Sequence, residues 1–330
     1  MFSIPDVRYR VSKKHGETFK IYYMLFSDYD RRIYARLYNS IENYQSEVVF
    51  EPEISMARIR HIFLRVLADN PILFWVRKDI ECYYERGNLI VKMVFIISKE
   101  RIIELKREIT TKVNEIYDEC VPGCLSDYEL ELAVHDYLTK SVKYVDDGCD
   151  EQQTMVGPLL KGVGVCEGIA FAFSYIMGVF GIRCTTIYGQ LKNSDVGHAW
   201  NMVFLEGKGY HVDVTHDLEC CTYPGCHAHL NLKDVDYSNR VWESEIKCVS
   251  ENFNYFKCSM LKCNSERKAK ECLQKMVNSH ANSMELQLNE DLDINEVISA
   301  LGEECAKLGV TCKHMWIVER RCLFTQAINT

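Results

Sequence analysis

The sequence predicts an α+β protein in which helices pack against an antiparallel sheet. Three observations lead to this fold class. Apolar residues recur at helical spacing in several segments. Two pairs of strand-like runs are each joined by a short turn that contains glycine, the signature of antiparallel hairpins. A glycine-rich stretch followed by an apolar helical stripe lies between the two hairpins.

The first part of the chain is expected to be a support region of helices and one hairpin. Its first 24 residues have no clear pattern. Asn70-Pro71 ends the second helix, because the residue before a proline is driven out of the helical conformation. Ser98 is a candidate N-cap for the third. The expected elements are helices over 32–41 and 55–68, strands at 79–84 and 89–97, and a helix over 99–118.

Cys166 is expected in the first turn of a helix. Two glycines in residues 162–165 allow a sharp turn, and an apolar stripe then begins. The positive end of a helix stabilises a thiolate and directs backbone N–H groups at an oxyanion. Gly168 leaves room for close approach by another segment. A buried structural thiol would fit the same local pattern. The stripe consists of Ile169, Ala172, Phe173, Ile176 and Phe180.

A hairpin is expected after this helix and the strand that follows it. Its strands are residues 197–205 and 210–215, and its turn is Glu206-Gly207. A two-residue turn places Trp200 opposite Asp213 and puts His198 on the same face as Asp213, as diagonal neighbours roughly 7–8 Å apart.

The shared face makes Cys166, His198 and Asp213 candidates for one reactive site. Nucleophilic acyl transfer needs a thiol, a base within hydrogen-bond reach and a group that orients the base. His211 lands on the same face, so register alone does not select the members. A core histidine and a turn carboxylate are the plainer interpretations of His198 and Asp213.

Three ordered blocks resemble the transglutaminase-like superfamily, and more narrowly its bacterial members of uncharacterised function. They are Gly-Val-Cys-Glu-Gly-Ile-Ala, Gly-His-Ala-Trp-Asn and Tyr-His-Val-Asp-Val-Thr-His-Asp. Similar stretches lie at 68–74, 131–138 and 231–234. The strong resemblance covers residues 125–245, and a weaker one extends over 30–125.

The resemblance implies a papain-like/transglutaminase-like core, with the nucleophile helix packed on an antiparallel sheet. It also implies that Cys166, His198 and Asp213 form the catalytic triad. The activity would be peptidase, amidase or transglutaminase chemistry at peptide or protein amide bonds. The family also contains members that have lost catalysis, so a peptide- or protein-binding module with the same fold is the alternative.

Two details stay open within the resemblance. The family often has Trp where this chain has His216, which is either a solvent-facing replacement or a change in the floor of the site. The Cys166 backbone N–H would supply half of an oxyanion hole. Gln152 or Gln153 is a candidate for the other half by analogy with papain-type enzymes, although surface glutamines are the simpler interpretation.

Composition limits the partners. The net charge of -8 argues against nucleic acid, because phosphate binding needs a basic surface. There is no signal peptide and no apolar run of about 18 residues, which predicts a cytoplasmic protein without a membrane partner. The 16 cysteines are therefore expected to be mostly free thiols. Oligomeric state cannot be inferred.

No cofactor and no metal are predicted. Nucleotide and calcium-binding motifs are missing from the sequence. One segment is rich in soft ligands, but it lacks the repeated Cys-x2-Cys spacing of zinc sites. That segment contains Cys220, Cys221, Cys226, His227 and His229.

The chain is expected to divide into three parts. Residues 1–120 form the helix and β-hairpin support region, and 121–245 form the transglutaminase-like catalytic core. Residues 246–330 form an α/β extension packed on that core, with helices over 264–279 and 292–308 and strands at 284–288 and 312–319.

Overall fold

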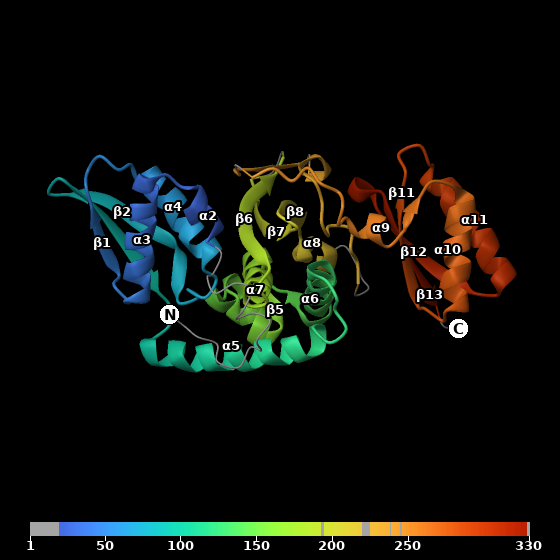
Figure 1. Cartoon of the computed structure of the whole chain (residues 1–330), viewed down its shortest axis with the longest axis horizontal. Helices are drawn as coiled ribbons and strands as arrows, with labels where there is room; N and C mark the ends of the chain where they lie inside the picture. The colour runs from blue at the N-terminus through green and yellow to red at the C-terminus, as the bar shows by residue number, and fades with distance from the viewer. Residues whose placement is uncertain (1–19, 193–194, 220–224, 238, 245, 329–330) are drawn as a thin grey trace.

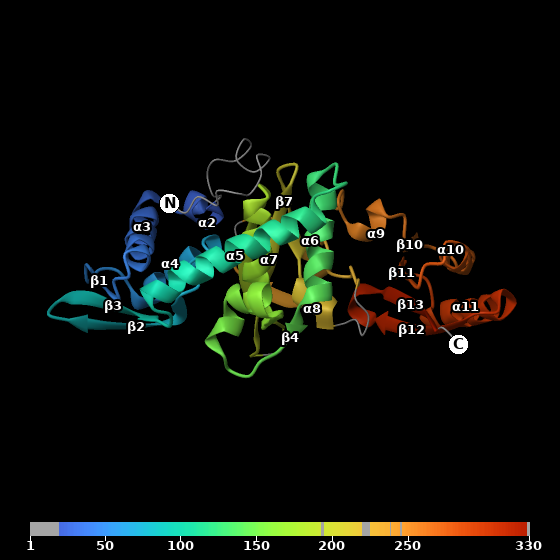
Figure 2. The same ribbon diagram turned by 90° about the horizontal axis from the view of Figure 1, so that it is seen from below.

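The structure is a computed structural model that describes residues 20–192, 195–219, 225–237, 239–244 and 246–328. It has three lobes side by side (Figure 1). We call residues 21–95 the N-terminal lobe, 127–242 the central lobe and 255–328 the C-terminal lobe. Helix α5 (Lys99–Cys120) runs beneath the first two lobes (Figure 2). No helix among the described residues is long and apolar enough to cross a bilayer.

The N-terminal lobe has three helices and a three-stranded sheet. The sheet order is β1-β3-β2, so β2 is an edge strand. The predicted hairpin and the predicted helix after Ser55 are confirmed, whereas β1 was not predicted. The elements are α2 (Ile21–Leu25), α3 (Asp28–Glu42), β1 (Glu47–Phe50), α4 (Met56–Asp69), β2 (Val76–Glu85) and β3 (Asn88–Phe95).

Serine side chains cap α5 and the helix that follows it. Ser98 accepts a hydrogen bond from the Arg101 backbone N–H at the start of α5, as predicted. Ser126 accepts one from the Glu129 N–H, and the Glu129 carboxylate accepts the Leu125 N–H at 2.6 Å, a reciprocal arrangement close to a capping box. The sequence is therefore locally consistent with the fold at these helix starts.

The central lobe packs helix α7 on a four-stranded antiparallel sheet of order β8-β7-β6-β9. This is the predicted α+β arrangement. Helix α7 begins at Cys166, as expected from the glycine-rich stretch. The elements are α6 (Asp127–Ser141), β4 (Lys143–Tyr144), β5 (Val163–Gly164), α7 (Cys166–Val179), β6 (Arg183–Leu191), β7 (Gly197–Leu205), β8 (Lys208–Val212), α8 (Val214–Glu219) and β9 (Arg240–Trp242), with single helical turns at Asp150–Gln153, Gly157–Lys161 and Asp234–Tyr237.

The register of the β7–β8 hairpin agrees with the prediction. Leu205 pairs with Lys208 and Met202 with His211, so the turn has two residues. Both turn residues have positive φ, 49° for Glu206 and 77° for Gly207, as a type I′ turn requires. The second strand ends sooner than predicted. It stops at Val212, and α8 begins at Val214 instead of the strand continuing to Thr215.

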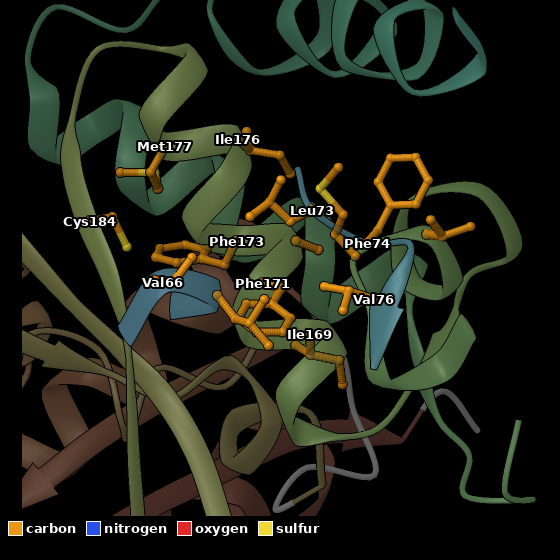
Figure 3. Close-up of a cluster of buried hydrophobic side chains, with 14 of the residues drawn as sticks. Val66, Leu73, Phe74, Val76, Ile169, Phe171, Phe173, Ile176, Met177 and Cys184 are labelled. Atoms are coloured by element: carbon orange, nitrogen blue, oxygen red, sulfur yellow. The ribbon is translucent and has the colours of Figure 1, made fainter. Parts of the chain in front are cut away.

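One buried apolar cluster joins the N-terminal lobe to helix α7. Figure 3 shows side chains of the N-terminal lobe lying against the apolar face of α7, and each of them is buried. Apolar surface shared in this way resists separation of the two lobes. The position of the N-terminal lobe relative to Cys166 is therefore fixed by packing. The labelled residues are Val66, Leu73, Phe74, Val76, Ile169, Phe171, Phe173, Ile176, Met177 and Cys184.

The C-terminal lobe has its own buried cluster, formed by residues from Cys263 to Leu323. Two helices pack with a four-stranded sheet of order β10-β11-β13-β12. The two predicted helices and two predicted strands are present, and β13 was missed. The elements are α9 (Tyr255–Cys258), β10 (Lys262–Cys263), α10 (Glu266–Asn278), β11 (Ser283–Leu288), α11 (Ile294–Leu308), β12 (Thr311–Ile317), a helical turn at Val318–Arg320 and β13 (Cys322–Ile328).

Candidate active site

The Cys166 thiol lies at the N-terminus of α7. Val165 is the N-cap in an extended conformation and provides no side-chain cap. The N–H groups of the first turn are therefore available to an anion at the sulfur. Gly168 is required for a close approach, as expected, because a Cβ there would lie 2.1 Å from the Gln152 carbonyl oxygen.

His198 connects Cys166 to Asp213. Its Nε2 lies 2.8 Å from Asp213 Oδ2, and Cys166 lines the same cleft as His198 and contributes to the electrostatics of its ring. Since Nε2 faces the carboxylate, Nδ1 is the ring nitrogen left for the sulfur. The His198 side chain is 10% exposed and Asp213 is fully buried. The structure thus brings the three predicted site residues together.

The electrostatics of the pair favour a charged imidazole. Burial disfavours the cation, but the charge of Asp213, its hydrogen bond and contact with Cys166 outweigh burial and raise the pKa of His198 to about 10. Burial also opposes the Asp213 carboxylate, and the charges of His198 and His216 overcome this and hold its pKa well below the usual range. A protonated His198 is a suitable partner for a thiolate.

Two further side chains hold Asp213. Arg240, on β9, places Nη2 3.2 Å from Asp213 Oδ2. His216 Nδ1 lies 2.8 Å from the same oxygen, and the His216 backbone N–H donates to Oδ1 at 3.1 Å. His216 is therefore part of the site and not the solvent-facing replacement that the sequence allowed. Arg240 was missed, because its position follows from strand pairing that no local pattern predicts.

His211 is excluded from the site by its partners. Trp200 Nε1 donates to His211 Nδ1 at 3.0 Å, and His211 Nε2 lies 3.0 Å from Asp234 Oδ1. An indole N–H can only donate, so Nδ1 is an acceptor and Nε2 carries the proton. Both ring nitrogens are occupied, which leaves His198 as the imidazole next to Cys166.

Cys166 and His198 open into a cleft of about 780 Å³ between the N-terminal and central lobes. One wall comes from α4 and β2 of the N-terminal lobe and combines apolar with charged side chains. The other comes from α7 and the ends of β6 and β7, where Gly197 is exposed. The lining residues are Arg60, Phe63, Leu64, Lys78, Asp79, Ile80, Cys166, Glu167, Tyr188, Gly189, Gly197, His198 and Ala199.

The two glutamines considered for the oxyanion hole do not line this cleft. Gln152 is buried, and its Oε1 accepts the Asp147 backbone N–H at 3.2 Å. Gln153 lines a separate small hollow next to Arg77 and Asp150. Neither position supports the analogy with papain-type enzymes.

Three groups in the described part of the chain have the composition of metal ligands. In each, hydrogen bonds between members account for the arrangement, as for His227 Nε2 and Asp136 Oδ1 at 2.8 Å. Of the cysteine- and histidine-rich segment, Cys220 and Cys221 lie outside the described residues. The groups are His135/Asp136/His227, His198/Asp213/His216 and His211/Asp234/Cys248.

Comparison with known proteins places part of the chain in a family. Residues 114–214 match the model of the transglutaminase-like superfamily. The mouse kyphoscoliosis peptidase is 24% identical over 155 residues, which are 42% of this chain and 23% of that protein. The chain therefore spans about a quarter of the length of this relative.

Two solved structures resemble about half of the chain. One is described as a TGase, with 13% identity, a TM-score of 0.31 and coverage of 51% of this chain and 50% of its own. The other is named as a candidate cysteine protease from Cytophaga hutchinsonii, with 14% identity, a TM-score of 0.30 and coverage of 51% and 71%. Both TM-scores are too low to support a function. The segment that carries Cys166, His198 and Asp213 therefore matches the transglutaminase-like superfamily.

Proposed function

We propose that this protein catalyses thiol-dependent hydrolysis or acyl transfer at amide bonds of peptides or proteins, with Cys166 as the nucleophile. The observation that carries the proposal is the placement of His198, which is hydrogen-bonded to Asp213 and lines an open cleft together with Cys166. A thiol, a base and a carboxylate in this order are the parts that acyl transfer through a thioester requires.

In the proposed mechanism the Cys166 thiolate attacks the amide carbonyl carbon. The Cys166 N–H, exposed at the start of α7, donates to the developing oxyanion. The His198 imidazolium gives its proton to the leaving amine, and the C–N bond breaks to leave a thioester. Neutral His198 then takes a proton from the incoming water or amine, which attacks the thioester; the C–S bond breaks and the Cys166 thiolate beside protonated His198 is restored. Asp213 keeps the ring oriented and stabilises its cation.

The cleft suits an extended polypeptide. Phe63, Leu64 and Ile80 contribute apolar atoms to one wall, and Gly197 is exposed on the other. This combination favours one apolar side chain of the substrate near the bond that reacts. The mouse relative is named a peptidase, which is consistent with a peptide or protein substrate.

The proposal is tested by incubating the protein with a denatured protein mixture and identifying the products by mass spectrometry, with and without a primary amine. New peptide termini or deamidated glutamines indicate water as the acceptor, and amine-labelled glutamines indicate transfer. Cys166→Ser should lower the rate at which every product forms by about a thousandfold or more. Unchanged products in Cys166→Ser would refute the proposal.

Asp213→Asn provides the second arm of this test. Without the carboxylate charge, burial dominates and His198 loses its proton at neutral pH, so we expect turnover to fall by about a hundredfold or more. If the protein instead binds peptides that stay intact, with equal affinity in the wild type and Cys166→Ser, then the non-catalytic binding module is the correct function.

A further inference from the structure

The residue after the nucleophile, Glu167, brings a negative charge to the site. Its carboxylate belongs to the first turn of α7, and the residue is 4% exposed. Tyr188 donates its hydroxyl to Oε1 at 3.0 Å, and Lys78 Nζ lies 2.6 Å from Oε2. Both oxygens are thus held, one by a neutral group and one by a cation.

Lys78 reaches Glu167 from a different lobe. It lies on the edge strand β2, where the pairing with β3 is interrupted between Val76 and Ile80. An interruption of this kind bends a strand and redirects a side chain, and such features occur next to active sites. Lys78 lines the cleft together with Cys166 and His198. The common core of the N-terminal lobe and α7 keeps this strand in position.

The pair matters because a thiolate at Cys166 would form next to an existing carboxylate. Like charges in a partly buried site disfavour ionisation, and an opposite charge nearby favours it. The charge of Lys78 interacts with both Glu167 and Cys166. Although burial opposes the ammonium, these anions outweigh it and raise the pKa of Lys78, so the lysine stays charged. The titratable or charged groups around Cys166 are Arg60, Lys78, Asp79, Glu167, Tyr188, His198 and, behind His198, Asp213.

We propose that Lys78 is a positioning residue of the active site, which offsets the Glu167 charge and so sustains the Cys166 thiolate. The N-terminal lobe then supplies a functional group as well as a wall of the cleft. The inference rests on the proposed function of Cys166, and it assigns the Lys78–Glu167 pair a role beyond the three residues Cys166, His198 and Asp213.

The test measures alkylation of Cys166 by iodoacetamide from pH 4 to 9 in the full chain, with the labelled cysteine identified by peptide mapping. Removing the cation with Lys78→Met should move the half-maximal pH up by about one unit, and removing the anion with Glu167→Gln should move it down by a similar amount. The double variant should return to within about 0.3 units of wild type, since both charges are gone.

Two controls separate this role from a structural one. Lys78→Arg keeps the charge and should keep the wild-type profile. Arg77→Met removes a cation from the next residue of the same strand, which pairs with Asp150 at 2.7 Å and lines a different hollow. It should leave the profile unchanged. Thermal unfolding of each variant verifies that the protein is folded.

The outcomes distinguish the inference from the proposed function. If wild-type Cys166 reacts rapidly but Lys78→Met and Glu167→Gln both keep the wild-type profile, the role of Lys78 is refuted and the function stands. If both variants shift the profile in the same direction, the charge balance is likewise refuted. If wild-type Cys166 reacts no faster than exposed cysteines, both proposals fall.

Discussion

At the scale of single residues, one buried ionisable group outside the site makes the free energy of unfolding depend on pH. Glu131 on α6 is fully buried. Its Oε2 accepts a hydrogen bond from Asn231 Nδ2 at 2.7 Å, while Oε1 has no hydrogen-bond partner within the described part of the chain. Burial raises the pKa of Glu131 to about 8, although the Asn231 bond opposes this. At neutral pH the carboxyl is therefore protonated.

Replacing Glu131 with Gln should remove a loss of stability that accumulates as the pH rises from 4.5 to about 8. The unfolded chain releases this proton near pH 4.5 and the folded chain near pH 8. The folded state thus holds one more proton between these values, and the free energy of unfolding falls by about 1.4 kcal/mol per pH unit there. Urea denaturation at pH 5 to 8 gives the free energy of unfolding of both proteins. The wild-type value minus the Glu131→Gln value should fall with this slope. A difference independent of pH would contradict the assignment.

Single residues also show where sequence reasoning stopped. Cys166, His198 and Asp213 could be singled out because the residues around each of them form a recognisable local pattern. For Cys166 the pattern is a glycine-rich helix start, and for His198 and Asp213 it is a hairpin. Arg240 and Lys78 could not. Both reach the site from strands far away in the chain, and their side chains become relevant only when β9 pairs with β6 and β2 faces the cleft.

At the scale of elements, the start of α7 depends on close contact with the turn at Asp150–Gln153. Gly168 faces this turn. A side chain there would meet the carbonyl oxygens of Gln152 at 2.1 Å and Thr154 at 2.8 Å. Both contacts are with backbone, which cannot rotate away. The position of the Cys166 turn is thus set by a glycine that admits a neighbouring segment.

Two glycines of the same helix provide a matched test. Gly168→Ala should destabilise the protein by about 3 kcal/mol or more, because the turn or the helix must shift. Gly178→Ala adds the same methyl group where nothing lies within 4 Å, and it should stabilise the protein by about 0.5–1 kcal/mol through helix propensity. Thermal unfolding compares the two. Equal effects would mean that the turn does not contact α7 as described.

The hairpin explains which elements could be predicted. The β7–β8 register followed from turn length and side-chain alternation, both of which are local. The end of β8 could not be predicted in this way, because Val214 and Thr215 are β-branched and fit a strand. In the structure, Asp217 on α8 instead accepts the His229 backbone N–H and contacts His135, which favours a helical turn. Tertiary partners overrode the local pattern.

At the scale of the whole molecule, buried ionic contacts attach the C-terminal lobe to the central lobe. His227 lies between Asp136 on α6, at 2.8 Å, and Glu285 on β11, at 3.1 Å. Its ring also stacks on Tyr255, with centroids 3.9 Å apart. Although burial opposes the cation, the two carboxylates raise the pKa of His227 to about 10. The histidine therefore remains charged at neutral pH and holds two acids that would otherwise repel each other.

His227→Asn should weaken this attachment strongly. It leaves the buried Glu285 carboxylate without its cation and Asp136 with only Lys140 and His135 as ionic partners, which costs about 3 kcal/mol. Limited proteolysis should then release the C-terminal lobe, and urea unfolding should occur in two steps. The control is His314→Asn, because the Thr325 hydroxyl is the one polar partner of His314 among the described residues. This variant should lose less than about 1 kcal/mol of the free energy of unfolding. A similar response of both variants would contradict the role of His227.

The division of the chain at residues 120 and 245 stays a prediction. The buried cluster that extends from Ile33 to Leu230 crosses the first boundary, so the N-terminal lobe and the central lobe share one core. The second cluster, from Cys263 to Leu323, lies wholly beyond the second boundary. Sequence patterns predict elements well within each part, but they do not reveal which apolar faces meet.

The most direct test of the central claim compares the alkylation rate of Cys166 with that of Cys149, an exposed free thiol of the same chain. At pH 6 an ordinary cysteine is only about 0.3% thiolate. A Cys166 paired with protonated His198 should react about a hundredfold faster than Cys149 and lose this advantage in His198→Ala. Equal rates for the two cysteines in the wild-type protein would contradict the claim.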